Sequence, residues 1–194
     1  METVRTFVAF RLPGDVQRLI GDLVERLHVP GLKVRWVEPE NLHLTVKFLG
    51  EVPTDRLDSV FGAVEDACRG VRAFRLSLDG VGAFPNLRWP RVVWVGLGSG
   101  RDEAERLAAS VEDRLADAGF AREDRSFKAH VTVGRVKERS PLAGTLGERI
   151  AAERLAFEGI GVHSVEVMKS QLTRQGPIYT VQKTVALVAG EGSG

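Results

Sequence analysis

Two tetrapeptides of the same form occur in this chain, His43-Leu44-Thr45-Val46 and His130-Val131-Thr132-Val133. In each, a histidine and a threonine stand two residues apart, and an apolar residue follows each of them. Because side chains alternate between the two faces of a β-strand, each tetrapeptide predicts a strand with one apolar face. The other face carries an imidazole and a hydroxyl. Two such strands in one chain indicate that both reactive faces serve the same site.

Two imidazoles on one site can divide the work of acid–base catalysis. A neutral imidazole removes a proton from water, and a protonated one gives a proton to the leaving oxygen. The two hydroxyls can donate to the non-bridging oxygens of a phosphate. This chemistry suits a phosphodiester with an internal leaving group, such as a five-membered cyclic phosphate, and it needs no cofactor or metal. His43 and His130 are therefore the candidate catalytic residues and Thr45 and Thr132 the candidate phosphate-binding residues, while the pattern leaves open which histidine is the acid.

Other interpretations of the two histidines can be weighed on the sequence. A single His-x-Thr strand is more often structural, since threonine favours strands and an imidazole can bond a buried backbone group. A second copy among only four histidines argues against that interpretation. Both histidines with Glu40 could hold zinc, but the threonines would then have no role. A nucleotide- or RNA-binding module without turnover is a third class, and it would not need a matched acid–base pair.

The composition sets limits on class and partners. The 194 residues, 43% of them hydrophobic, can bury the core of one domain or two small lobes. A net charge of +1 excludes a strongly basic nucleic-acid coat, so contact with RNA should be local. Cys68 is the only cysteine, and no apolar run reaches about 18 residues. We therefore expect a soluble cytoplasmic protein without membrane contact, and a monomer.

Apolar periodicity and turn residues predict an α+β fold in which the two histidine strands occupy equivalent places. We interpret this as an internal duplication: two lobes with a pseudo-two-fold axis between their sheets, forming one domain over residues 1–189. A flexible glycine-rich tail would follow at 190–194. The glycines and prolines from 80 to 90 predict a loop. The expected helices are 13–27, 54–68, 102–118 and 146–152, and the expected strands are 4–12, 34–37, 43–49, 74–78, 91–97, 130–136, 162–172 and 178–188.

At these residues the chain resembles the 2H phosphoesterase superfamily, and within it the RNA 2′,3′-cyclic phosphodiesterases, also called 2′-5′ RNA ligases. The resemblance covers nearly the whole chain. It differs at Ala129, where the family commonly has proline. The stretches that carry it are Phe7-Val8-Ala9-Phe10-Arg11-Leu12-Pro13, the run from Trp36 to Gly50, Pro90-Arg91-Val92-Val93-Trp94-Val95-Gly96-Leu97, the run from Phe127 to Arg135, and Gly176-Pro177-Ile178-Tyr179.

The resemblance implies a bilobal fold with mostly antiparallel sheets on either side of a central cleft and helices on the outside. It implies that His43 protonates the departing ribose oxygen, that His130 activates water, and that the product is a 2′-phosphomonoester. It also implies that Arg135 lies near the substrate. Phe7 and Tyr179 could stack on a base or line the cleft. The reverse reaction, 2′-5′ ligation of RNA ends, uses the same acid–base pair and stays open as an alternative.

Overall fold

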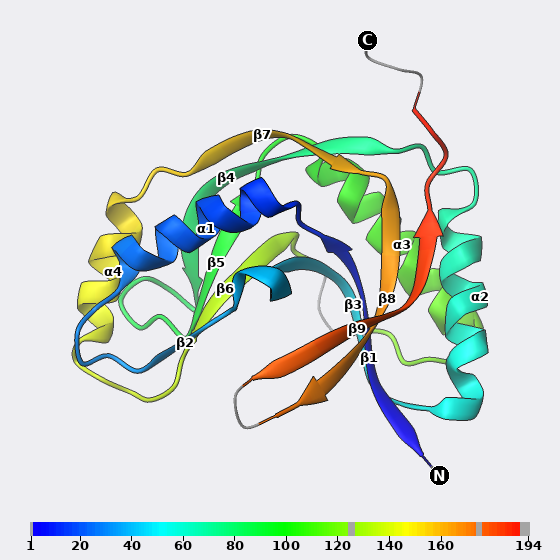
Figure 1. Ribbon diagram of the computed structural model, residues 1–194, viewed down its shortest axis with the longest axis horizontal. Helices are drawn as coiled ribbons and strands as arrows, with labels where there is room; N and C mark the ends of the chain where they lie inside the picture. Colours follow the sequence, from blue (N-terminus) through cyan, green and yellow to red (C-terminus); the bar gives the residue numbers. More distant parts are fainter. Residues whose placement is uncertain (1, 124–126, 174–175, 191–194) are drawn as a thin grey trace.

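Both His-x-Thr tetrapeptides begin a β-strand, as the alternation predicts. They open β3 (His43–Pro53) and β6 (His130–Val136). The computed structural model describes residues 2–123, 127–173 and 176–190. In these ranges the two motif strands lie side by side at the centre of a curved nine-stranded sheet (Figure 1).

The sheet runs in the order β7-β4-β5-β6-β3-β1-β8-β9, with β2 paired to β6 as well. All pairings between these strands are antiparallel, which confirms the predicted α+β class. The remaining strands are β1 (Thr3–Arg11), β2 (Val34–Trp36), β4 (Phe74–Phe84), β5 (Val92–Leu97), β7 (Ala156–Val162), β8 (Ser164–Leu172) and β9 (Pro177–Ala186). The α-helices are α1 (Gly14–Leu27), α2 (Leu57–Cys68), α3 (Arg101–Asp117) and α4 (Ala143–Ala152), and short 3₁₀ turns lie at Pro39–Asn41 and Thr54–Arg56.

The sheet has two halves that meet at a single residue pair. One half contains β3, β1, β8 and β9, and the other contains β6, β5, β4 and β7. Between β3 and β6 the only paired residues in the described ranges are Leu44 and Val131. The two predicted sheets are therefore continuous through this one pair. The helices lie outside the sheet, α1 with α4 at one end and α2 with α3 at the other (Figure 1).

Within each half of the sheet, strands that are distant in the sequence lie side by side. The strand that follows α2, β4, pairs with β5 rather than with β1. The strand β8, late in the chain, pairs with β1. The half with β3 and β1 therefore combines strands from the two ends of the chain, whereas β4, β5, β6 and β7 follow one another in a single segment, 74–162.

The apolar faces of the motif strands lie in the core. Leu44, Val131 and Val133 are completely buried and Val46 is 6% exposed. Helix α1 contributes a buried stripe at helical spacing, Val16, Ile20, Leu23 and Leu27. The burial of these faces fixes the opposite faces, with the histidines and threonines, toward the outside of the core.

The structure corrects three sequence predictions. β4 continues through the predicted loop to Phe84, because Gly80 adopts φ +74° at a register shift and the strand then resumes. β3 runs past Gly50 to Pro53. Strand β7 was not predicted; within the described ranges it is an edge strand paired with β4 alone, and its exposed positions lack a regular apolar pattern. The predicted tail at 190–194 falls outside the described residues except for Gly190.

Candidate active site

The register between the motif strands arranges their four polar side chains. The strands pair at Leu44 and Val131. Extending this antiparallel register by one residue in each direction puts His43 opposite Thr132 and Thr45 opposite His130. Directly opposite residues in an antiparallel pair have Cβ atoms about 5 Å apart, and diagonal neighbours about 7–8 Å. The two histidines are diagonal neighbours in this scheme. This register places both imidazoles and both hydroxyls at the junction of the two halves of the sheet.

Each imidazole is oriented by the backbone in the same way. The Nδ1 of His43 lies 2.7 Å from the carbonyl oxygen of Asn41, and the Nδ1 of His130 lies 2.6 Å from that of Lys128. In both motifs the carbonyl belongs to the residue two positions before the histidine. A carbonyl can only accept, so Nδ1 carries the proton, and Nε2 is the nitrogen available to a substrate.

The two histidines differ in their surroundings. The ring of His43 contacts Phe7, with centroids 4.9 Å apart, and Tyr179, at 5.2 Å. Burial lowers the pKa of His43 below its usual value, although the hydrogen bond to Asn41 acts in the opposite direction. The ring of His130 contacts Phe84 at 5.3 Å.

A β-bulge brings Arg135 to the same cleft as Thr132. They are three positions apart, so regular alternation would place them on opposite faces. In the β5–β6 pairing, Trp94 is opposite Thr132 and Val93 is opposite Gly134, which leaves Val133 as an extra residue. The extra residue reverses the alternation. Arg135 and Thr132 therefore both line the cleft.

The cleft has a volume of about 1010 Å³, at the upper end of the range for ligand sites. Its walls come from β1, β2, β3, β6, the segment 37–41 and the hairpin of β8 and β9. Six of the seven predicted site residues line it: Phe7, His43, Thr45, Thr132, Arg135 and Tyr179. His130 is not among the lining residues; it is placed by its position two residues before Thr132 on the same face of β6.

Three arginines line the cleft, Arg5, Arg35 and Arg135, together with two glutamates, Glu38 and Glu40. Arg35 and Arg135 are paired across β2 and β6, and both are exposed. Two like charges on neighbouring strands favour an anion between them. Burial raises the pKa of Tyr179, whereas Arg135 and Arg5 act to lower it, so both guanidinium groups influence the centre of the cleft.

Of the predicted residues, Phe7 is only 3% exposed, so its ring packs against His43 rather than offering a free face. Sequence reasoning missed two other residues that shape this site, Asn41 and Phe84. Asn41 holds His43 with its carbonyl, and its side-chain amide donates to the carbonyl of Pro177 at 3.1 Å. The sequence did contain a signal for this contact, because the carbonyls that hold His43 and His130 both belong to the residue two positions before the histidine. Phe84 gave no such signal, since its contact with His130 depends on the pairing of β4 with β5.

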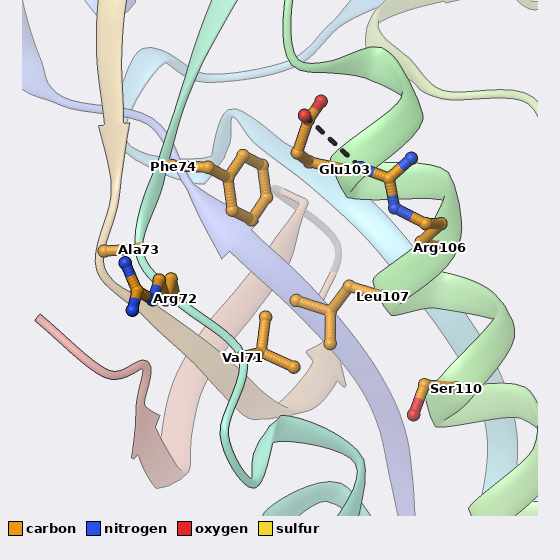
Figure 2. Close-up of a pocket in the computed structure, with 8 residues that line it drawn as sticks. All are labelled: Val71, Arg72, Ala73, Phe74, Glu103, Arg106, Leu107 and Ser110. Carbon is orange, nitrogen blue, oxygen red and sulfur yellow. Dashed lines mark ion pairs between the residues drawn. The ribbon is translucent and has the colours of Figure 1, made fainter. Parts of the chain in front are cut away.

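A second, smaller pocket lies away from this cleft, between the start of β4 and helix α3 (Figure 2). Its volume is about 400 Å³. Phe74 and Leu107 line it, and Arg106 forms an ion pair with Glu103 at 3.3 Å in its wall. None of the predicted site residues belongs to it, and we assign it no part in the chemistry.

Around β3 and β6 the structure brings together two histidines, each with its Nδ1 held by a backbone carbonyl, and the cleft residues Thr45, Thr132 and Arg135. The sequence comparison gives the family: residues 10–94 and 95–179 each match the family described as LigT like Phosphoesterase. The chain belongs to this family. The two successive matches agree with the duplication inferred from the tetrapeptides.

Relatives with curated names extend over almost the whole chain. The chain is 39% identical over 177 residues to an Archaeoglobus fulgidus protein named RNA 2′,3′-cyclic phosphodiesterase, covering 91% of this chain and 96% of the relative. A protein of the same name from Methanothermobacter thermautotrophicus is 36% identical, with 91% and 95% covered.

Solved structures show the same fold. A crystal structure of a Thermus thermophilus protein superposes with a TM-score of 0.80 at 28% identity and covers 96% of this chain and 100% of its own. The structure of E. coli LigT complexed with 3′-AMP has a TM-score of 0.78 at 28% identity, with 96% and 99% covered. The resemblance to 2H phosphoesterases noted in the sequence is confirmed. None of the helices in the described ranges is long and apolar enough to cross a membrane.

Proposed function

We propose that this protein hydrolyses RNA 2′,3′-cyclic phosphodiester ends to 2′-phosphomonoesters by acid–base catalysis between His43 and His130. The observation that carries the proposal is the matched anchoring of the two imidazoles. Each Nδ1 is bound to a carbonyl two residues earlier, which leaves both Nε2 atoms for the substrate. The names of the relatives and the 3′-AMP bound to E. coli LigT support the substrate class.

The proposed roles follow the resemblance. His43 gives its proton to the 3′ oxygen as the P–O3′ bond breaks, and His130 removes a proton from the attacking water. Thr45 and Thr132 donate hydrogen bonds to the non-bridging oxygens. Donation by His43 requires its protonated form, which burial disfavours in the free protein. A bound phosphodiester anion supplies the charge that favours protonation.

The test of this function is a product assay on an oligonucleotide with a 2′,3′-cyclic phosphate. We expect a 2′-phosphate end, resolved from a 3′-phosphate by chromatography. A 3′-phosphate product would contradict the assignment of the leaving oxygen. Binding without turnover would instead favour a binding module. Joining of a cyclic-phosphate end to a 5′-hydroxyl end would show the reverse reaction, 2′-5′ ligation.

Removing either threonine hydroxyl should lower turnover without unfolding the protein. Thr45→Val and Thr132→Val keep the shape and strand propensity of the side chain but remove the donor. We expect each to lower kcat by roughly 10- to 10³-fold, the range for one lost hydrogen bond to the transition state. The midpoint of thermal unfolding should stay near that of the parent protein.

The matched control is Thr184→Val, on the exposed side of β9 and outside the cleft. It should leave kcat unaffected. A cleft variant that unfolds easily while its folded fraction keeps full activity would assign the hydroxyl to stability.

Turnover should not depend on a divalent metal ion. The two imidazoles and two hydroxyls already provide proton transfer and charge stabilisation. Activity measured after dialysis against EDTA should equal that of the untreated protein. A loss on chelation that zinc or manganese restores would show that a metal takes part.

A further inference from the structure

The two motif strands share a second feature: each has a bulge directly after its threonine. In β3, Ala9 is opposite Thr45 and Val8 is opposite Lys47, so Val46 is the extra residue. Val133 is the extra residue in β6. In both strands the alternation reverses, and the residue three positions after the threonine enters the cleft. These equivalent residues are Arg135 in one strand and Phe48 in the other.

Phe48 is unusual for a large apolar side chain because 42% of it is exposed. The guanidinium of Arg5, also a cleft residue, lies over its ring at 4.6 Å from the centroid. Arg5 also forms an ion pair with Glu51 at 3.8 Å. The cleft thus contains a flat aromatic group and a flat cation, one on the other. Unstacked nucleic-acid bases bind to such planar groups.

The position of Phe48 favours a base that is not part of the reacting nucleotide. Phe48 is three residues beyond Thr45, roughly 10 Å along an extended strand. Tyr179, in contrast, touches His43 itself and offers an aromatic ring beside the reaction centre. The cleft volume leaves room for more than one nucleotide.

We propose that Phe48 and Arg5 form a stacking site for the base that precedes the terminal cyclic-phosphate nucleotide. The proposal rests on the proposed function and specifies its substrate: an RNA oligomer rather than a free cyclic mononucleotide. The oligomer gains binding energy from the second base. The protein should therefore have a higher kcat/KM for a dinucleotide than for a mononucleotide with the same terminal group.

The test compares Phe48→Leu with Phe48→Tyr on two substrates, a 2′,3′-cyclic mononucleotide and a dinucleotide with the same 2′,3′-cyclic end. Leucine keeps the apolar bulk but removes the planar ring, and tyrosine keeps the ring. Phe48→Leu should reduce the ratio of dinucleotide to mononucleotide kcat/KM by roughly 5- to 150-fold, the range for one stacked base. Phe48→Tyr should retain the ratio. Trp89→Leu, an aromatic residue 51% exposed but outside the cleft, is the matched control.

Binding provides a readout that does not depend on turnover. Calorimetric titration with the 2′-phosphorylated dinucleotide, at one fixed salt concentration, should show a weaker affinity for Phe48→Leu by a similar factor. Equal losses on both substrates would overturn the proposal, because Phe48 would then serve the terminal nucleotide. An unchanged ratio together with unchanged dinucleotide affinity would also overturn it. Absence of hydrolysis by the parent protein would contradict the proposed function alone, since the titration still tests the stacking site.

Discussion

Replacing His43 or His130 with alanine is expected to lower kcat/KM by roughly three or more orders of magnitude. General acid and general base catalysis each contribute about 10²–10⁴-fold. The two histidines lie on adjoining strands at equivalent positions, and each has a fixed Nδ1 and a free Nε2. The double variant should be little worse than the worse single variant, because groups that act as a unit are not additive. His28→Ala, at the exposed end of α1, is the control and should keep full activity.

The pH profile gives a second measurement on the same pair. One histidine must be charged and the other neutral, so kcat/KM should be bell-shaped, and its two limbs belong to the pair. Burial lowers the pKa of His43. Because of this shift, one limb of the kcat/KM profile should lie below the ordinary histidine value of about 6.5. In the profile of kcat this limb should lie at higher pH, because the bound anion raises the pKa of His43 in the complex.

Two results would contradict the paired mechanism. A single alanine variant with near-normal activity would remove that histidine from the chemistry. A monotonic pH profile between about pH 4 and 9 would mean that only one titrating group is required.

The second large effect is on stability and concerns a buried ion pair behind the first motif strand. Lys47 is only 4% exposed; its ammonium lies 2.7 Å from a carboxylate oxygen of Glu112 on α3 and donates to the carbonyl of Ala121 at 3.0 Å. Glu112→Leu would leave this ammonium with Glu123 at 4.0 Å as its nearest carboxylate among the described residues. We expect a loss of about 2–4 kcal/mol in the free energy of unfolding, since an uncompensated buried charge is costly.

The remaining variants of the cycle separate the charge effect from lost packing. Lys47→Met should cost less, because Glu112 is 21% exposed and water can solvate it. The double variant should be more stable than Glu112→Leu alone, since no charge is then stranded. Urea unfolding measures all three. Lys33→Met, which breaks a pair between side chains 73% and 51% exposed, should change stability by less than about 0.5 kcal/mol. A fully additive cycle at Lys47 and Glu112 would show that the pair is not coupled.

The central part of the site could be predicted because it depends only on alternation within short strands. The polar faces of 43–46 and 130–133 follow from the apolar residues between them, and these residues are buried. Strand alternation alone could not predict the positions beyond each threonine. Alternation would place Lys47 beside Thr45 and Arg135 on the back of β6. The bulges reverse both, so that Lys47 lies in the core and Arg135 in the cleft.

The extents of the strands were harder to predict than their existence. Turn residues marked a loop from 80 onward, but Gly80 and Gly82 lie inside β4. A Cβ at Gly82 would come within 2.2 Å of the indole of Trp94, so the glycine is required by a neighbour on β5. A glycine in a sequence is equally typical of a turn and of a strand position where a neighbouring side chain lies against the backbone. Only the residue on the paired strand decides between the two.

β4 belongs to the first repeat but pairs with β7 of the second, and β8 belongs to the second repeat but pairs with β1 of the first, so the repeats cannot be separated. A cut between the two family matches, at 94–95, would divide β5; the N-terminal piece would lose β8 as the partner of β1, and the C-terminal piece would lose β4 and half of β5. Each piece would then carry an unpaired sheet edge that invites association with another chain. A single repeat could complete its sheet only by exchanging its last strand with a second copy. The architecture is thus that of a strand-swapped dimer whose two subunits have been joined into one polypeptide.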